Sequence, residues 1–385
     1  MSRPDVLIVG AGVIGLAVAR DLASRGLDVV VLDRTRPGAG ASWAAAGMLS
    51  PHLVRQSGAG QRAFLRLAAR SLELHDGLAG ALLEESGIDV QRDRDGILEV
   101  APDEERARDL EQRLQIRAAV GLPARWLTAA EVLDLEPGLR PGLYGGAHHL
   151  RDGHLDARRL CRALGRSARL AGARTETAAP VARLWLGGGK VRGVVADGER
   201  REAGRVVIAA GWRSGELAPP GRPPLPLEPV RGQILTLEEA RGRVRRPILS
   251  PDGYVVPRPG GRVLAGSTQE AGERDPRPTL AGVAVIAAMA GALVPGLADR
   301  PFGTAWAGLR PFTPDGLPIL GIDPEHEALI WATGHGANGV LLAPATAEWV
   351  AGLVAGTGPP QDPSAFRPDR FTGSSSAGSP GGPVA

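Results

Sequence analysis

The chain has 385 residues, 43% of them hydrophobic, so it can bury one large or two ordinary cores as a globular protein. Its 45 basic and 42 acidic residues are intermixed, and only five Phe and two Tyr are present to stack on bases, which argues against nucleic-acid binding. Cys161 is the single cysteine, which excludes an internal disulfide or a cysteine-bound metal and fits the reducing cytoplasm.

The N-terminal residues predict a strand–helix–strand unit. The apolar "DVLIVG" is followed by "AGVIGLAVARDLASRG", with Gly26 as the expected helix C-cap, and then by the strand-like "LDVVVLD". A signal peptide is not expected, because Asp5 precedes the apolar run and the glycines within the run have the spacing of a nucleotide-binding turn.

Helical patterns dominate the next section of the chain. Apolar residues at helical spacing predict a helix over 61–85, and a charged helix is predicted over 103–120. Thr128 and Glu131 form a T-x-x-E capping box for a short helix, and Asp156 is the expected N-cap of a further amphipathic helix.

Strand patterns are more frequent afterwards. "RVVIAAG", ending at Gly211, and "ALIWATG", ending at Gly334, are apolar without alternation, which suits a sheet covered on both faces. Residues 279–298 carry no charge, but alanine and glycine dominate them and Pro295 interrupts them, so we expect a buried or half-buried helix and not membrane contact. Residues 372–385 have the composition of a disordered tail.

The motif "GAGVIG" predicts a dinucleotide site. Gly10, Gly12 and Gly15 have G-x-G-x-x-G spacing between a strand and a helix: the first makes the turn, the second admits the pyrophosphate, and the third lets helix and strand pack. The helix N-terminus then offers free N–H groups to phosphates. Asp33 ends the second strand, where it can accept hydrogen bonds from ribose hydroxyls, and Arg34 beside it is expected to be solvated or to cover the adenine.

Distant parts of the chain favour FAD over a nicotinamide cofactor. A nicotinamide-binding domain is usually one contiguous block, whereas apolar strand patterns like the first one recur at 206–211 and 329–334. A sheet assembled from such distant segments is typical of a flavoprotein.

The stretch "GASWAAAGMLSPH" at 40–52 has small residues where a flat ring could approach the backbone. An isoalloxazine needs backbone N–H groups at close range, and a run of alanine and glycine provides them. The alternative is a tightly packed turn without a ligand. The residues expected along the ring edge are Ala44, Ala45, Ala46 and Gly47.

Eight motifs carry a resemblance to a known family. They are "VLIVGAGVIGLAVARDLASRG", "GASWAAAGMLSPH", "VIAAGWRS", "EPVRGQIL", "YVVPR", "GRVLAGST", "WAGLRPFTPDGLPILG" and "GHGANGVLLAPATAEWV". Over nearly the whole chain, up to about Phe371, the sequence resembles the FAD-dependent amino-acid oxidase superfamily of D-amino-acid oxidase and sarcosine oxidase. Within it, the chain is most similar to the bacterial glycine oxidases of thiamine biosynthesis. The second and seventh motifs are specific, and the others are shared widely.

The resemblance implies a set of FAD-binding residues. The helix that starts near Asn338 would point its N-terminus at the flavin and favour negative charge there. His335 is either a proton relay or, as we expect, a hydrogen-bonded loop residue. Together with Gly211, the residues expected at the cofactor are Val13, Ile14, Asp33, Arg34, Ser42, Ala46, Gly47, Met48, Val181, Gly334, His335, Gly336, Ala337, Asn338, Gly339, Val340 and Leu341.

The resemblance also implies the substrate contacts. Arg310 would bind an α-carboxylate through two parallel bonds, with the hydroxyl of Tyr254 beside it. The sequence departs from the glycine oxidase pattern at three positions: Gly336 and Ala337 replace an aromatic residue and an arginine, and Gln269 replaces a methionine in the pocket wall. These departures leave the substrate preference open.

The cofactor is expected to be noncovalent. Sarcosine oxidases of the superfamily tether FAD through a cysteine and use a lysine near the flavin. In this chain Cys161 lies in an amphipathic helix and Lys190 in a turn, so neither residue matches those roles.

These features define the expected fold class: an α/β protein with a Rossmann-like FAD domain built from discontinuous segments, and a second α+β domain with a mainly antiparallel sheet. The FAD-binding domain is predicted to comprise 1–87, 151–225 and 309–371. The substrate domain is predicted to comprise 88–150 and 226–308.

The expected function is oxidative deamination of glycine or another small amine or amino acid, by hydride transfer from Cα to flavin N5, with oxygen as the acceptor and with hydrogen peroxide as a product. Two alternatives stay open. One is a D-amino-acid or D-proline dehydrogenase that reduces a quinone, and the other is a flavin-binding subunit without activity of its own. A homo-oligomer is compatible with the sequence, which leaves oligomeric state and stereochemistry undefined.

Overall fold

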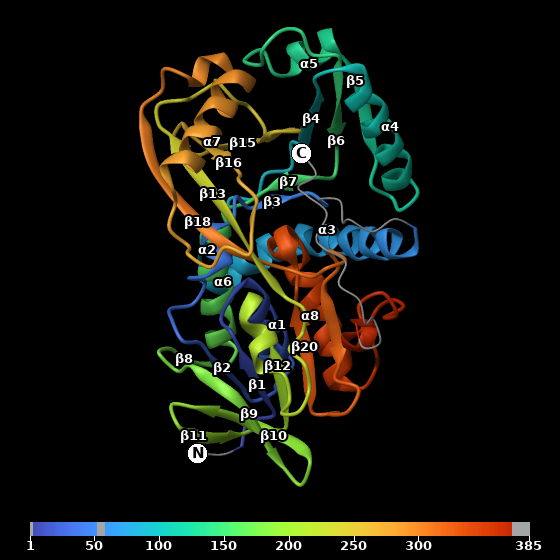
Figure 1. The fold of residues 1–385 in the computed structure, drawn as a ribbon, viewed down its shortest axis with the longest axis vertical. Coiled ribbons are helices and arrows are strands. Elements are labelled where there is room, and N and C mark those ends of the chain that lie inside the picture. Colours follow the sequence, from blue (N-terminus) through green and yellow to red (C-terminus); the bar gives the residue numbers. More distant parts are fainter. Residues whose placement is uncertain (1–2, 52–57, 372–385) are drawn as a thin grey trace.

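The computed structural model describes residues 3–51 and 58–371 and consists of two sheet-centred parts that lie one above the other (Figure 1). Sheets of six and nine strands form the centres of the two parts. The predicted tail at 372–385 lies outside the described residues, as does His52 at the end of the alanine-rich stretch. The α/β fold class with a Rossmann-like part is confirmed.

The six-stranded sheet joins segments that are far apart in the sequence. The first strand pairs in parallel with the second and also with a strand about 200 residues later, in register from Val6↔Arg205 to Val9↔Ile208. The discontinuous sheet predicted from the apolar segments is therefore present. Its strands, in spatial order, are β19 (Ile319–Ile322), β20 (Leu329–Thr333), β12 (Arg205–Ile208), β1 (Val6–Val9), β2 (Val29–Leu32) and β8 (Arg174–Glu176).

Both faces of this sheet are covered, which explains why its central strands are apolar throughout. Helices pack on one face and a small antiparallel sheet packs on the other. As predicted, the side chain of Asp156 caps the helix Ala157–Leu170 by accepting from the N–H groups of Arg158 and Arg159. The covering elements are α1 (Val13–Ser24), α3 (Ala59–Ser86), α6 (Ala157–Leu170) and α8 (Gly339–Ala355), and β9 (Val181–Gly187), β10 (Lys190–Ala196) and β11 (Glu199–Glu202).

The nine-stranded sheet is mainly antiparallel and is built around one long pair. β13 (Glu228–Leu237) runs beside β18 (Phe302–Phe312) over the whole length of both strands, and β18 crosses the domain limit predicted at 308/309. One parallel contact, between β14 and β4, makes the sheet mixed. The other strands are β4 (Ile97–Ala101), β5 (Ala124–Thr128), β6 (Gly145–His149), β14 (Ile248–Ser250), β15 (Gly253–Arg258), β16 (Arg262–Gly266) and β17 (Glu270–Ala271).

Three helices accompany the nine-stranded sheet. α4 (Glu104–Ala118) begins after Asp103, whose side chain accepts from the N–H of Arg106. α5 (Ala129–Leu135) has the predicted capping box. The third helix is α7 (Leu280–Leu293), and the shorter elements of the chain are α2 (Ala41–Ala44), β3 (Met48–Leu49), β7 (Gly153–His154), η1 (Gly211–Leu217), η2 (Pro295–Leu297), η3 (Gly336–Asn338) and η4 (Pro368–Phe371).

Two apolar helices differ in how much of them is covered. α7 buries Gly282, Ile286, Ala290 and Leu293 against the nine-stranded sheet and exposes its other side, so it is the half-buried helix that we expected. Within the described residues, the stretch Gly336–Ala355, which contains α8, is the one helix long and apolar enough to span a membrane, but most of it is buried inside the protein.

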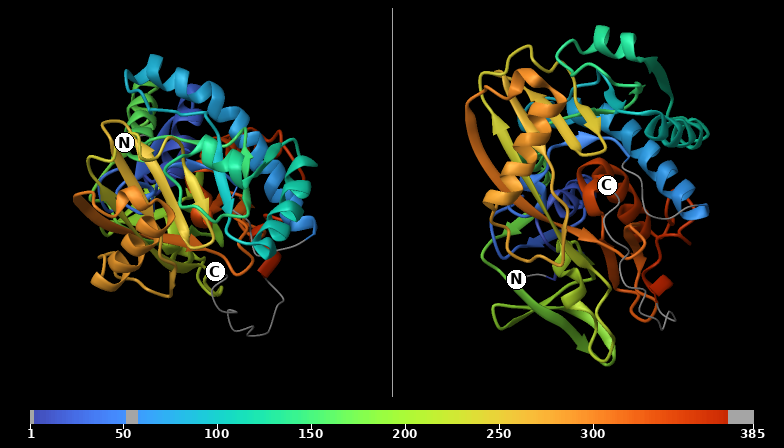
Figure 2. Two further views of the ribbon diagram at one scale, coloured as in Figure 1. Left: turned by 90° about the horizontal axis from the view of Figure 1, so that it is seen from above. Right: turned by 45° about the horizontal axis from the view of Figure 1, so that its top comes forward.

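The first turn of α8 is fixed by the long helix α3, which lies beside it (Figures 1 and 2). Ser71 donates from its hydroxyl to the carbonyl of Leu341 at 2.6 Å. His75 Nε2 lies 3.1 Å from the carbonyl of Val340 and 3.0 Å from that of Leu341, which requires a proton on Nε2. Burial lowers the pKa of His75 to about 4, so the ring is neutral at pH 7.

We predict that His75 makes the fold sensitive to acid. Its pKa is about 6.5 in an unfolded chain and about 4 in the folded one, so the unfolded chain binds the extra proton and stability falls as the pH drops from 6.5 towards 4. Between pH 7 and pH 5 this residue should remove roughly 2 kcal/mol from the free energy of unfolding. Urea unfolding at both pH values should show a smaller loss for His75→Gln than for the native chain, and an equal loss in both proteins would contradict the assignment.

Candidate active site

A cavity of about 1590 Å³ is lined by residues of both parts of the molecule. It begins at the carboxyl ends of β1 and β2, where open α/β sheets bind ligands, and continues to α4 and α7 beside the nine-stranded sheet. Its volume exceeds the roughly 300–1,000 Å³ of a site for one drug-sized molecule, so it can hold a large cofactor together with a small substrate.

The three glycines of the first turn have distinct steric roles. Gly10 has φ +108° and a Cβ there would lie 2.4 Å from the carbonyl oxygen of Ala209 on the neighbouring chain segment. At Gly15 a Cβ would lie 1.9 Å from the carbonyl oxygen of Gly10, so the third glycine lets α1 pack on the turn. Gly12 lines the cavity at the start of α1, as a phosphate-binding position requires.

Asp33 and Ser42 organise the backbone around this turn. The Asp33 carboxylate accepts from the N–H of Ala11 at 2.7 Å and from the N–H of Thr35 at 2.7 Å, and it also lines the cavity. Ser42 Oγ accepts from the N–H of Val13 at 2.9 Å, which places the hydroxyl at the N-terminus of α1. Both groups lie where the ribose and the pyrophosphate of a dinucleotide were expected.

The alanine-rich segment is held by its carbonyl groups. Trp43 accepts from Arg158 Nε at 3.0 Å, Ala44 from Trp306 Nε1 at 3.1 Å, and Gly47 from the N–H of Leu155 at 2.9 Å. Among the described residues, the N–H groups of Ala46 and Gly47 have no hydrogen-bond acceptor, although both residues are buried and line the cavity. Buried donors without a partner indicate a ligand with acceptor atoms at this position.

The start of α8 closes another wall of the cavity. Gly336 and Ala337 are followed by Asn338 at the N-cap, so the wall is made of small residues and a helix N-terminus. His335 Nε2 lies 3.0 Å from Thr346 Oγ1, and burial lowers the pKa of His335 to about 3. The ring is therefore neutral and hydrogen-bonded at physiological pH, as expected for a loop residue with a satisfied hydrogen bond.

The structure brings most of the expected site residues into one cavity. Three do not line it: Gly15 packs against Gly10, Gly334 has φ +74° and faces Thr313, and Leu341 is buried in the core with its carbonyl bound by Ser71. The expected residues that line the cavity are Gly10, Gly12, Val13, Ile14, Asp33, Arg34, Ser42, Ala45, Ala46, Gly47, Met48, Val181, Gly211, Tyr254, Gln269, Arg310, His335, Gly336, Ala337, Asn338, Gly339 and Val340.

Arg310 is held in place by its neighbours on the sheet. Its Nη2 donates to Ser267 Oγ at 2.6 Å and its Nη1 donates to the carbonyl of Thr268 at 3.1 Å, which leaves other N–H groups of the guanidinium for a ligand. A Cβ at Gly232 would lie 2.3–2.6 Å from three atoms of this guanidinium. The absence of a side chain at 232 is therefore what gives Arg310 its position.

The position of Tyr254 also depends on a glycine, Gly266, that leaves room for its side chain. Tyr254 pairs directly with Gly266 on the adjacent strand, where a Cβ would lie 2.8 Å from the tyrosine hydroxyl. Burial raises the pKa of Tyr254, and the nearby Arg310 acts in the opposite direction. The hydroxyl is thus protonated at neutral pH and can donate a hydrogen bond into the cavity.

Sequence reasoning missed the glycines that shape this face. Gly232, Gly266 and Gly308 each occupy a strand position where a side chain would collide with Arg310, Tyr254 or Ala44. A glycine inside a strand often marks close approach of another group, and all three lie within the quoted motifs, so a signal was present. What the sequence could not provide was the partner of each glycine, because that partner is set by cross-strand register and domain contact.

The site combines a nucleotide-binding turn, the unpartnered N–H groups of Ala46 and Gly47, and the anchored side chain of Arg310. Together these features define an FAD-dependent oxidoreductase. The residues fit the cofactor, because Asp33, the start of α1 and the donors at Ala46 and Gly47 match ribose, pyrophosphate and flavin in turn. Residues 5–353 match the family model described as "FAD dependent oxidoreductase" (DAO), and the chain belongs to this family.

Relatives narrow the class to amino-acid oxidoreductases that use FAD. The chain is 35% identical to glycine oxidase from Bacillus licheniformis over 354 residues. The match covers 92% of this chain and 94% of that protein. It is also 33% identical to the bifunctional protein ThiO/ThiG from Synechocystis, over 95% of this chain and 54% of that protein. The crystal structure of glycine oxidase from Geobacillus kaustophilus superimposes with a TM-score of 0.91 at 34% identity, over 97% of this chain and 100% of that one.

We predict that Gly232→Ala weakens the binding of small carboxylates by displacing the Arg310 guanidinium. Loss of one of two parallel charge-assisted bonds should raise the dissociation constant of acetate by about tenfold, which corresponds to about 1.4 kcal/mol. Acetate binding can be followed by the visible absorption of bound FAD. Gly80→Ala in α3, where the new Cβ meets nothing within 4 Å, is the matched control and should bind acetate normally. Equal acetate affinity in the two variants would refute this role of Gly232.

Proposed function

We propose that the protein catalyses the oxidative deamination of glycine or another small amine or amino acid, with oxygen as the electron acceptor. The observation that carries the proposal is the pair Arg310 and Tyr254, which face the same cavity as the FAD-binding segments. The name glycine oxidase, carried by several relatives, supports this substrate class.

The protein's own groups act by positioning the substrate. The Arg310 guanidinium binds the α-carboxylate through parallel charge-assisted bonds, and the protonated hydroxyl of Tyr254 donates to the same group. This grip fixes the orientation of Cα. FAD, when bound, accepts the hydride from Cα and passes the electrons to oxygen.

The amine must be neutral to release hydride, and the site favours the deprotonated form without a dedicated base. His335 is not assigned as a proton relay, because it is neutral and hydrogen-bonded to Thr346. Loss of hydride gives an imine, which water hydrolyses to an oxo acid and ammonia, while oxygen takes up the two electrons and two protons to form hydrogen peroxide.

The cavity wall near Gly336 and Ala337 leaves space for a small substituent on the substrate. Gly336 and Ala337 present almost no side chain, and the exposed amide of Gln269 lines the cavity without a hydrogen-bond partner among the described residues. We therefore place glycine first and include other small amines and amino acids in the proposal.

We further propose a cytoplasmic enzyme that supplies its imine to thiazole synthesis. Relatives named ThiO/ThiG support a link to that pathway. The single buried thiol of Cys161 is compatible with a reducing compartment.

Anaerobic titration of the yellow holoprotein tests the proposal. Glycine, sarcosine, D-alanine and D-proline are added in turn and the flavin absorbance is followed. We expect bleaching by glycine, followed on admission of air by recovery of the colour and one peroxide per flavin. Bleaching that only a quinone reverses would indicate a dehydrogenase, and no bleaching with any amine would indicate a binding subunit; either result overturns the proposal.

Arg310→Lys tests the anchor itself. Lysine keeps the charge but loses the fork that binds two carboxylate oxygens, so we expect KM for glycine to rise by about 10–100-fold, or about 1.4–2.8 kcal/mol, with a smaller change in kcat. Arg183→Lys, at an exposed position on β9, is the control and should behave as the native enzyme. An unchanged KM in Arg310→Lys would remove Arg310 from the site.

A further inference from the structure

The guanidinium of Arg258 does not line the cavity but binds a backbone carbonyl of the alanine-rich segment. Its Nη2 donates to the carbonyl of Ala46, and its Nη1 donates to the carbonyl of Leu155 at 3.0 Å. Leu155 in turn donates from its N–H to the carbonyl of Gly47, so Arg258 and the Leu155 backbone together fix Ala46 and Gly47. Arg258 is the last residue of the motif "YVVPR", and the resemblance implies no role for it.

The Ala46 carbonyl and the Gly47 N–H belong to one peptide unit, which gives this contact a chemical consequence. In a trans peptide the two groups point in opposite directions, so a guanidinium on the oxygen aims the N–H away from it. Gly47 lines the cavity, and its N–H has no acceptor among the described residues. A cation on the carbonyl oxygen also polarises the peptide and makes the N–H a stronger donor.

Close packing around Gly47 leaves no room for a side chain at this position. Its φ is +76°, and a Cβ there would lie 2.0 Å from the carbonyl oxygen of Leu155 and 3.3 Å from Arg258 Nη2. Burial lowers the pKa of Arg258 to about 10, which leaves the guanidinium charged at neutral pH. The charge is therefore permanent under working conditions.

Arg258 also connects the cofactor seat to the substrate anchor. Tyr254, Val256 and Arg258 alternate along β15 and so share one face of the sheet, where Tyr254 and Val256 pack with Ala44 and Ala46. Tyr254 and Arg258 are four residue steps apart along the strand, a separation of about 14 Å. One rigid strand thus carries a substrate contact at one end and a cofactor-segment contact at the other.

We propose that Arg258 is a positioning residue for the flavin: through the Ala46–Gly47 peptide it presents a strengthened N–H donor to the ring and favours the electron-rich reduced state. The role concerns FAD and does not depend on which substrate is oxidised. The same cation would raise both the affinity for FAD and the two-electron midpoint potential.

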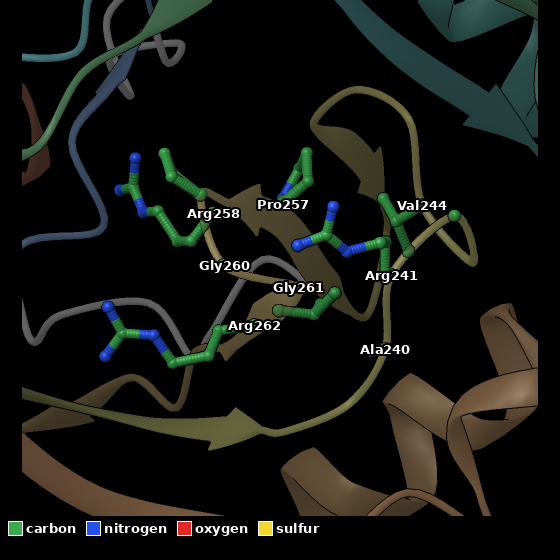
Figure 3. A pocket seen from close by; sticks show the side chains of 11 residues that line it. Ala240, Arg241, Val244, Pro257, Arg258, Gly260, Gly261 and Arg262 are labelled. Carbon is green, nitrogen blue, oxygen red and sulfur yellow. The ribbon is translucent and has the colours of Figure 1, made fainter.

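Neighbouring arginines offer a matched control. Figure 3 shows Arg241, Arg258 and Arg262 around a small surface pocket, with the side chains of Arg258 and Arg262 extending to the same side. Arg262 is exposed, and no hydrogen-bond or ion-pair partner of its side chain lies among residues 3–51 and 58–371. Replacing Arg262 removes an equal charge nearby without touching the alanine-rich segment.

The test compares Arg258→Met, Arg258→Lys and Arg262→Met. FAD affinity is measured by titrating apoprotein, and the midpoint potential by dye equilibration. For Arg258→Met we expect FAD binding about tenfold weaker and a tenfold loss of preference for the reduced flavin, equal to about 30 mV for a two-electron couple. Arg258→Lys keeps the charge but cannot span both carbonyls, so the potential should return towards the native value while FAD binding stays weakened. Arg262→Met should match the native protein in both.

Native affinity and potential in Arg258→Met would overturn the proposal, as would equal shifts in the Arg258→Met and Arg262→Met variants, which would indicate a general charge effect. If Arg258→Met does not fold, Arg258→Lys decides: weaker FAD binding supports the role, and native binding refutes it. Failure of glycine to bleach the flavin would refute the proposed function and leave this result unaffected.

Discussion

The architecture depends on one close contact between the two parts of the molecule, at Gly308 of β18 and Ala44 of α2. A Cβ at Gly308 would lie 2.5 Å from the Ala44 Cβ, so the long strand of the nine-stranded sheet lies directly against the alanine-rich segment. Interiors are packed too densely to absorb such an intrusion without moving one of the parts. Because Arg310 is two residues further along β18, the same contact sets the distance between Arg310 and the alanine-rich segment.

Around this contact, the carbonyl groups of the alanine-rich segment have hydrogen-bond partners, whereas the N–H groups of Ala46 and Gly47 have none among the described residues. Carbonyl groups of the alanine-rich segment are bound by Arg158, Trp306, Arg258 and Leu155, none of which lines the cavity. Arg158 is itself fixed by stacking, with its guanidinium carbon 3.7 Å from the Trp43 ring centroid and 4.5 Å from that of Trp306. With these carbonyl groups occupied, the alanine-rich segment has the unpartnered N–H groups of Ala46 and Gly47 left for a ligand in the cavity.

Local patterns predicted much of this fold because they act within a few residues. The glycine-rich turn, the capping box of α5, the Asp156 cap and the unalternating strands each depend on spacing along the chain, and all are present. Arg310 and Tyr254 came from family resemblance, and the structure places both on the cavity. The roles of Gly232, Gly266 and Arg258 were not predicted, since each depends on a partner supplied by register or by the other part of the molecule.

The order of strands in the six-stranded sheet has a consequence for biosynthesis. β1 is the first strand to leave the ribosome, yet one of its two partners, β12, ends at Ile208, so an apolar strand edge stays open while most of the intervening chain is made. Contacts of such long sequence separation form slowly, and unpaired edges promote aggregation. A nascent chain shorter than about 210 residues can pair β1 with β2 but lacks β12, the second neighbour of β1, so one edge of this central strand must be shielded until translation passes β12.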